Sequence, residues 1–216
     1  MRSQGVALVT GLVILAAISL LAITAAGGLT LQRHQAANFQ DRIRAESAAD
    51  AAQSAALAWL YSRPDSDRQA GCIAACFLPD AIHAPGSLPL QPEFRSAEWW
   101  AEHAIPADRH PVSGEPGGVD VATGLEALWI VQEIHFDAID PAGNEQQVEG
   151  LAYYRVLARG RGRQANTVAV SESIVARPWH GRYETAAYPP ERALRAFCDP
   201  FDTELPCGVL AWRILR

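Results

Sequence analysis

The first part of the chain is uniformly apolar. Between Arg2 and Arg33 no residue carries a charge, and a helix over this run would be roughly 45 Å long at about 1.5 Å per residue. That exceeds the roughly 30 Å hydrocarbon core of a bilayer and the apolar core of about 7–15 residues found in a cleaved secretory signal. We therefore predict a retained membrane-spanning helix. The less favoured alternative is a discarded signal that ends at the small residues between Ala22 and Ala26.

The charges that flank this run predict its orientation. Arg2 precedes the run and Arg33 follows it. Under the positive-inside bias, the first residues are expected in the cytoplasm. The rest of the chain would then face outward.

A second pattern begins beyond Arg33, where alanine dominates and apolar residues recur every three or four positions. This spacing predicts that the helix continues with one apolar face, and alanine is the best helix former. Arg42 and Glu46 are four residues apart and are expected to pair, while Pro64 is expected to end the helix. The apolar face comprises Ala45, Ala48, Ala49, Ala52, Ala56, Trp59 and Leu60.

One helix over residues 6–62 would span roughly 85 Å. Gly27 and Gly28 lie near the middle, where two glycines cost about 2 kcal/mol relative to alanines and favour local melting. The first half belongs in lipid or among other helices, because it is apolar all round. The second half is expected to lie against a globular domain.

The remaining sequence predicts loops followed by strands. Residues 64–118 are irregular, with a short helix near 96–104, and alternating patterns then indicate strands. The Gly-rich connector GRGRQAN is predicted to form a hairpin loop. The segment PERALRAF is expected to form a helix, and GVLAWRIL is expected to form an edge strand. The expected fold class is α+β, with three or four antiparallel strands packed on the alanine face. The strands are expected at 128–136, 152–159 and 167–175.

Composition and charge narrow the function classes. The chain has 216 residues, with 18 basic residues against 24 acidic ones, for a net charge of -6. An acidic balance argues against nucleic acid as the main partner. All the basic residues are arginine, so the lysine of a phosphate-binding P-loop is missing.

Four cysteines in a chain expected outside the cytoplasm predict disulfides. Four cysteines allow three pairings, which sequence does not distinguish. We favour Cys198 with Cys207, which closes a short loop, and Cys72 with Cys76 by elimination. A metal held by Cys72, Cys76 and His83 is the weaker alternative, because no second closely spaced ligand pair follows.

Two polar clusters are candidates for other chemistry. His103 and His110 lie near several carboxylates, but without a metalloprotease-type spacing they read as solvated loop residues. We therefore expect neither catalysis nor a metal or other cofactor. The second cluster is basic. We favour its interpretation as a solvated hairpin tip, and the alternative is contact with an acidic neighbour or with DNA. The basic cluster comprises Arg155, Arg159, Arg161 and Arg163. Trp129 is expected in the core.

The N-terminus resembles a class III signal sequence of the type IV pilin superfamily. The resemblance rests on the short leader MRSQ, on Gly5, and on the stretch VALVTGLVILAAISLLAITAA that follows. It implies that prepilin peptidase cuts between Gly5 and Val6 and that Val6 is methylated. It also implies a glutamate at the fifth mature position, where this chain has Thr10. We therefore expect a poor repeating unit.

A second stretch, QRHQAANFQDRIRAESAADAAQSAALAW, resembles the stem of PilX-type minor pilins. The later segments LWIVQEI and YYRVLARGRGRQANTVAVSESI resemble paired strands of that family. The resemblance implies other minor pilins, the major pilin and inner-membrane lipid as partners, with DNA a less favoured one. The tip pseudopilin of type II secretion also lacks the glutamate and stays an alternative.

These observations predict a non-catalytic minor pilin that primes or caps a type IV pilus. It would cross the inner membrane once, with a periplasmic C-terminal domain, and enter a cell-surface pilus. An anchored periplasmic enzyme or binding protein is the alternative of another class. The expected segments are a leader (1–5), a membrane and filament-core helix (6–27), an amphipathic stem (28–63), an irregular region (64–118), and a sheet with a disulfide-looped extension (119–216).

Overall fold

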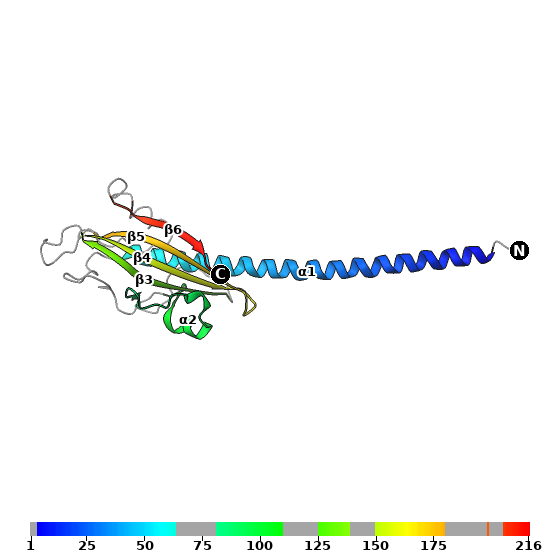
Figure 1. The fold of residues 1–216 in the computed structure, drawn as a ribbon, viewed down its shortest axis with the longest axis horizontal. Coiled ribbons are helices and arrows are strands. Elements are labelled where there is room, and N and C mark those ends of the chain that lie inside the picture. Colours follow the sequence, from blue (N-terminus) through cyan, green and yellow to red (C-terminus); the bar gives the residue numbers. More distant parts are fainter. Residues whose placement is uncertain (1–3, 64–80, 110–124, 139–149, 180–197, 199–204) are drawn as a thin grey trace. The chain divides into compact units, whose positions relative to one another are not determined.

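A computed structural model describes residues 4–63, 81–109, 125–138, 150–179, 198 and 205–216. The chain divides into two compact units, Met1–Asp41 and Arg42–Arg216. The first belongs to a long helix, and the second combines the rest of that helix with a sheet (Figure 1). In chain order the elements are α1 (Gln4–Ser62), β1 (Ile82–His83), η2 (Pro92–Phe94), α2 (Ala97–His103), β2 (Ile105–Pro106), β3 (Glu126–Ala138), β4 (Gly150–Arg161), β5 (Val168–Trp179) and β6 (Gly208–Ile214).

Helix α1 is continuous from Gln4 to Ser62. It ends two residues before Pro64, as predicted, because the residue before a proline is pushed out of the helical region. The helix also passes through Gly27 and Gly28 without a break, and local melting at these two glycines stays a prediction. Propagation adds one hydrogen bond per residue, and good helix formers on both sides outweigh the cost of two glycines.

Among the described residues the sheet has six strands in the order β1-β3-β4-β5-β6, with β2 also paired to β3. All pairs are antiparallel except β1 with β3. The four long strands match the sequence prediction, including the edge strand over GVLAWRIL. The two additional strands were missed because each is only two residues long, which is too short for an alternating pattern. The predicted helix over PERALRAF lies outside the described residues.

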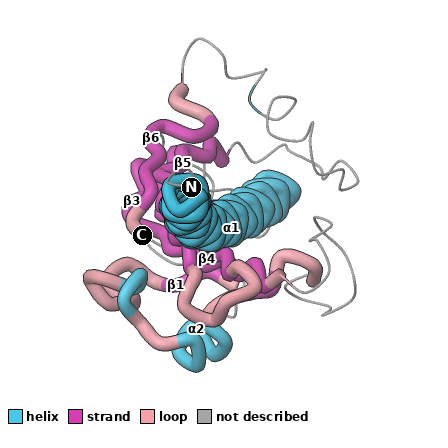
Figure 2. Tube along the Cα trace, turned by 90° about the vertical axis from the view of Figure 1, so that its right-hand side faces the viewer, coloured by secondary structure: helices cyan, strands magenta, loops and turns pink. Residues whose placement is uncertain are grey.

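The alanine face of α1 packs on one face of the sheet, and Figure 2 shows the strands beside the helix. All seven residues predicted for this face are at most 3% exposed. Gly160 of β4 lies so close to the α1 backbone that a methyl group at this position would meet main-chain atoms of Ala45, Ala48 and Ala49. Small side chains on both elements thus permit a close approach of helix and strand.

A second cluster covers the other face of the sheet. Trp100 of α2 is fully buried there with Leu128, Ile130 and Leu157. Ser96 caps α2 by accepting a hydrogen bond from the backbone N–H of Trp99, as Ser does at helix N-termini. The centre of β3 is consequently buried on both faces, whereas its alternation predicted a strand covered on one face only. The sequence did not reveal that α2 returns to cover the sheet.

Candidate functional site

The N-terminal half of α1 presents a bare apolar surface. Each described leucine, isoleucine and valine between Leu8 and Leu31 has between 57% and 72% of its surface exposed. Within the described residues, α1 alone is long and apolar enough to cross a membrane. Exposed apolar area on this scale marks a surface that contacts lipid or another protein.

The residues that the resemblance singled out lie near the start of α1. Gly5 and Val6 belong to the first turn of α1, and Thr10 follows just over one turn later with its side chain exposed. Cleavage and methylation at Gly5 and Val6, and an assembly role for Thr10, stay predictions.

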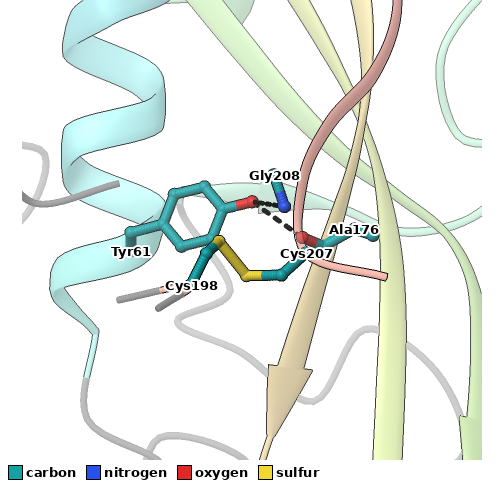
Figure 3. The surroundings of a disulfide bond; sticks show 5 residues. All are labelled: Tyr61, Ala176, Cys198, Cys207 and Gly208. Carbon is teal, nitrogen blue, oxygen red and sulfur yellow. Dashed lines mark hydrogen bonds between the residues drawn. A yellow bond between two sulfur atoms is a disulfide. The ribbon is translucent and has the colours of Figure 1, made fainter. Parts of the chain in front are cut away.

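A disulfide joins Cys198 to Cys207, as predicted, with an S–S distance of 2.05 Å and a Cα–Cα distance of 5.5 Å. Cys207 directly precedes β6, so the bond fixes the start of the edge strand (Figure 3). The other two cysteines, Cys72 and Cys76, lie outside the described residues, and their pairing stays a prediction.

Tyr61, in the last turn of α1, also holds the start of β6 in position. Its hydroxyl donates to the carbonyl oxygen of Ala176 on β5 at 2.7 Å and accepts from the backbone N–H of Gly208 on β6 at 3.1 Å (Figure 3). Burial raises the pKa of Tyr61 well above its ordinary value, against a smaller opposing effect of the Arg177 charge. The side chain is therefore a neutral hydrogen-bonded link among α1, β5 and β6.

The arginine cluster does not form a bare basic tip. Arg159 lies within β4, is nearly buried, and pairs with Glu126, while Arg161, the last residue of β4, pairs with the same carboxylate at 3.2 Å. Only Arg163 of the cluster lies in the loop between β4 and β5. The interface role predicted for Arg159, Arg161 and Arg163 is untested, and the burial of Arg159 leaves little of that side chain accessible.

Arg155, the remaining member, is also paired. Its guanidinium contacts Glu172 of β5 at 2.5 Å, and Arg213 of β6 contacts the same carboxylate at 3.0 Å. These pairs across strands could not be assigned from sequence, because they depend on the register of β3, β4, β5 and β6. The register places Glu126 opposite Arg161 and Glu172 opposite Arg213.

The histidine cluster forms local hydrogen bonds. His103 donates from Nδ1 to the Trp99 carbonyl oxygen at 2.9 Å, and His83 contacts the His103 carbonyl oxygen through Nε2 at 3.1 Å. Over the described residues, no group of three or more His, Cys, Asp or Glu side chains has the geometry of a metal site. His110 lies outside them.

The exposed carboxylate of Glu98 accepts hydrogen bonds from its own backbone N–H and from Ser96. These hydrogen bonds lower the pKa of Glu98.

One feature of the surface was missed by sequence reasoning. A notch of about 150 Å³ lies between α1 and the end of the sheet, and we call it the α1–β6 notch. The expected edge strand over GVLAWRIL was its sequence signal, and it did not reveal which helix residues lie opposite. The notch is lined by Glu46, Ala49 and Asp50 of α1, by residues 169–171 of β5, and by Trp212 and Ile214 of β6.

Comparisons with known proteins bear on the helical part of the chain. Residues 4–55 match the family described as PilX N-terminal. No significant match was found among curated proteins or among solved structures. The matched segment covers the exposed apolar half of α1 and most of the alanine face that packs on the sheet. The N-terminal segment of the chain, residues 4–55, is thus similar to the PilX N-terminal domain of type IV pilin-like minor pilins.

Proposed function

We propose that this chain is a minor pilin that helps to prime or cap a type IV pilus after prepilin peptidase has cut between Gly5 and Val6. Methylated Val6 would then begin α1, with residues 6–27 first in the inner membrane and later in the filament core. The observation that carries the proposal is the bare apolar half of α1, which lies within the PilX N-terminal match over residues 4–55. Such a surface needs lipid before assembly and neighbouring helices after it.

Thr10 supports a position at a filament end. In the pilins that this N-terminus resembles, the fifth mature residue is a glutamate that neutralises the charged N-terminus of a neighbouring subunit. This interaction is strong where water is excluded. A threonine hydroxyl forms hydrogen bonds but supplies no counter-charge. A subunit without this carboxylate would bind poorly to a neighbour's N-terminus, and so would rarely repeat along the filament.

The rest of the chain would act by contact rather than by chemistry. PilX-type pilins are generally structural, and the sheet with its disulfide-fixed edge offers a rigid platform for neighbouring subunits. Prepilin peptidase, other minor pilins and the major pilin are the proposed partners. The chain would reside in the inner membrane with its sheet in the periplasm, and then in a cell-surface pilus.

Mass spectrometry of the protein from membranes tests the processing step. We expect a mature chain that begins with methylated Val6, and a Gly5→Phe variant that keeps all five leader residues. A native chain that begins beyond Ala26 would overturn the proposal, because the proposed anchor would be missing. Unchanged cleavage of the Gly5→Phe variant would reject the leader assignment.

Pilus counts test the assembly role. Deletion of this chain should reduce the number of pili, and a Thr10→Glu variant should insert normally in the membrane but change its abundance along the filament. An unchanged distribution of the variant would remove the argument from Thr10.

A tip-type pseudopilin of type II secretion is the second candidate, because Thr10 fits that role equally. The two roles separate in the deletion strain. Loss of secreted enzymes with normal pili would favour the pseudopilin, whereas loss of pili with normal secretion would favour the minor pilin.

A further inference from the structure

The α1–β6 notch combines an exposed aromatic side chain with apolar walls. Trp212 is 51% exposed and Ile214 is 49% exposed, although both belong to the edge strand of the described sheet. Ala49 of α1 and Ala169 of β5 form the floor. A space of about 150 Å³ is large enough for a group the size of a benzene ring.

Trp212 is held in a fixed orientation despite its exposure. Its indole Nε1–H donates to Oε1 of Gln53 on α1 at 3.0 Å, and the Ser171 hydroxyl donates to the same oxygen at 3.2 Å. An exposed indole that is already ordered loses little conformational freedom on binding. Pre-organised aromatic residues of this kind are typical anchors of protein interfaces.

The rim of the notch is acidic. Glu46 pairs with Arg42 at 2.9 Å, whereas the Asp50 carboxylate has no hydrogen-bond or ion-pair partner among the described residues. Partial burial and the nearby Glu46 charge raise the pKa of Asp50. Asp50 therefore lacks a counter-charge at the mouth of an apolar notch.

The charges and apolar walls of the α1–β6 notch determine which chemical group can bind there. A cation beside Asp50 and Glu46 gains electrostatic stabilisation, and a guanidinium or ammonium group over the Trp212 ring gains a cation–π interaction. The methylene groups of an arginine or lysine side chain suit the Ala49, Ala169 and Ile214 walls, because such side chains bury their stems along apolar surfaces. A negatively charged or purely aliphatic occupant would leave Asp50 desolvated without a partner.

We propose that the α1–β6 notch receives an arginine or lysine side chain, carried on an apolar segment of a neighbouring pilin subunit. This inference rests on the proposed function, since it names the chemistry of a contact between pilin subunits. The notch lies wholly within the unit Arg42–Arg216. The proposed contact is therefore separate from the contacts of the apolar half of α1.

Site-specific photo-crosslinking in cells tests the proposal. The full chain would carry p-benzoylphenylalanine at Ile214, which leaves Asp50 and Trp212 intact, and crosslinked peptides would be identified by mass spectrometry. Two further positions serve as matched controls: Leu12, 65% exposed on the N-terminal half of α1, reports pilin assembly, and Phe94, 66% exposed beside α2, reports random collisions. We expect Ile214 to crosslink to a pilin segment that contains an arginine or lysine.

Charge reversal gives the test its specificity. An Asp50→Arg substitution should reduce the Ile214 crosslink by about tenfold or more, since like charges at an interface are strongly unfavourable. The crosslink from Leu12 should be unchanged. Replacing the identified basic residue of the partner by glutamate should restore the crosslink in the Asp50→Arg background. Circular dichroism of the Asp50→Arg variant checks that the exposed substitution leaves the fold intact.

The alternative outcomes separate the two proposals. A crosslink from Ile214 to a segment without a basic residue, or one that is insensitive to Asp50→Arg, overturns the assignment of the notch. Crosslinks from Leu12 to pilins without any from Ile214 overturn it too, but leave the proposed function standing. Absence of pilin crosslinks from both positions counts against both proposals.

Discussion

The backbone of Gly160 lies directly against the backbone of Ala45, so that no side chain fits between β4 and α1 at this point. The sequence predicted that Gly160 is the first residue of the hairpin connector GRGRQAN. The structure shows instead a strand residue whose missing side chain sets the distance between helix and sheet. The helix–sheet interface at Gly160 is therefore sensitive to added volume.

A Gly160→Ala substitution should destabilise the domain by about 2 kcal/mol or more, because a methyl group would overlap main-chain atoms and force the helix outward. Thermal unfolding of the full chain in detergent would report a melting temperature lower by roughly 4 °C or more. The matched control is Gly28→Ala, whose added methyl meets no atom within 4 Å and should stabilise the exposed helix by about 1 kcal/mol. An unchanged melting temperature for Gly160→Ala would contradict the close approach.

A Tyr61→Phe substitution should cost about 1–3 kcal/mol, because it keeps the ring but leaves the Ala176 carbonyl and the Gly208 N–H without this partner. Hydrogen exchange should rise mainly in β6, whose first residue is Gly208. Tyr153→Phe is the control, since the Tyr153 ring stacks on the exposed His135 and its change should lie within about 0.5 kcal/mol. Equal effects of the two substitutions would argue against the Tyr61 link.

The Tyr61 hydroxyl also predicts a response to alkali. Its folded-state pKa is raised above the ordinary value of 10.0 by burial, so its contribution to stability is fully present below pH 10 and is lost as the pH rises through the folded-state pKa. The difference in unfolding free energy between the wild type and Tyr61→Phe should therefore be constant up to about pH 10. Denaturant titrations between pH 7 and 11 measure this, and a difference that disappears below pH 9 would contradict the buried, neutral hydroxyl.

Removing the Cys198–Cys207 bond should destabilise the edge strand more than the rest of the sheet. The bond closes a loop with a sequence separation of 9, for which the loss of unfolded-state entropy is worth about 2–3 kcal/mol. We expect Cys198→Ser with Cys207→Ser to speed hydrogen exchange in β6 while the pairing of β3 with β4 stays protected. A serine pair is preferable to a chemical reductant, which would also reach other cysteines of the chain. Uniformly faster exchange across all strands would indicate a global role instead.

Asp50→Asn should slightly stabilise the isolated chain near neutral pH. The pKa of Asp50 is raised from 3.8 by burial and by Glu46, so its favourable contribution is present below about pH 3.8 and is lost as the pH rises through the folded-state value. Relief of the repulsion should add a few tenths of a kcal/mol at pH 7, and the gain should vanish in acid. Melting temperatures of both proteins at pH 3 and pH 7 provide the measurement. A loss of stability at pH 7 would mean that Asp50 already has a favourable partner.

The sequence by itself determined the elements whose signals are local. A long uncharged run and an alanine stripe at helical spacing determined α1, and alternating patterns determined β3, β4 and β5, because each pattern lies in consecutive residues. The apolar segment GVLAWRIL indicated the edge strand β6. The short loop between Cys198 and Cys207 favoured their pairing, and the structure decided it among the three possible pairings. Local patterns also indicated the PilX-like segment, which the family match over residues 4–55 confirms, whereas the leader stays a prediction.

Only the tertiary structure decided which of these residues meet. Long-range pairing placed Glu126 beside Arg159, which converted an apparent basic tip into paired charges within the sheet. It brought α2 across the outer face of β3 and seated Gly160 against α1. Strand register and packing of distant segments depend on all elements at once, so residues such as Asp50 and Trp212, far apart in sequence, come to share one notch.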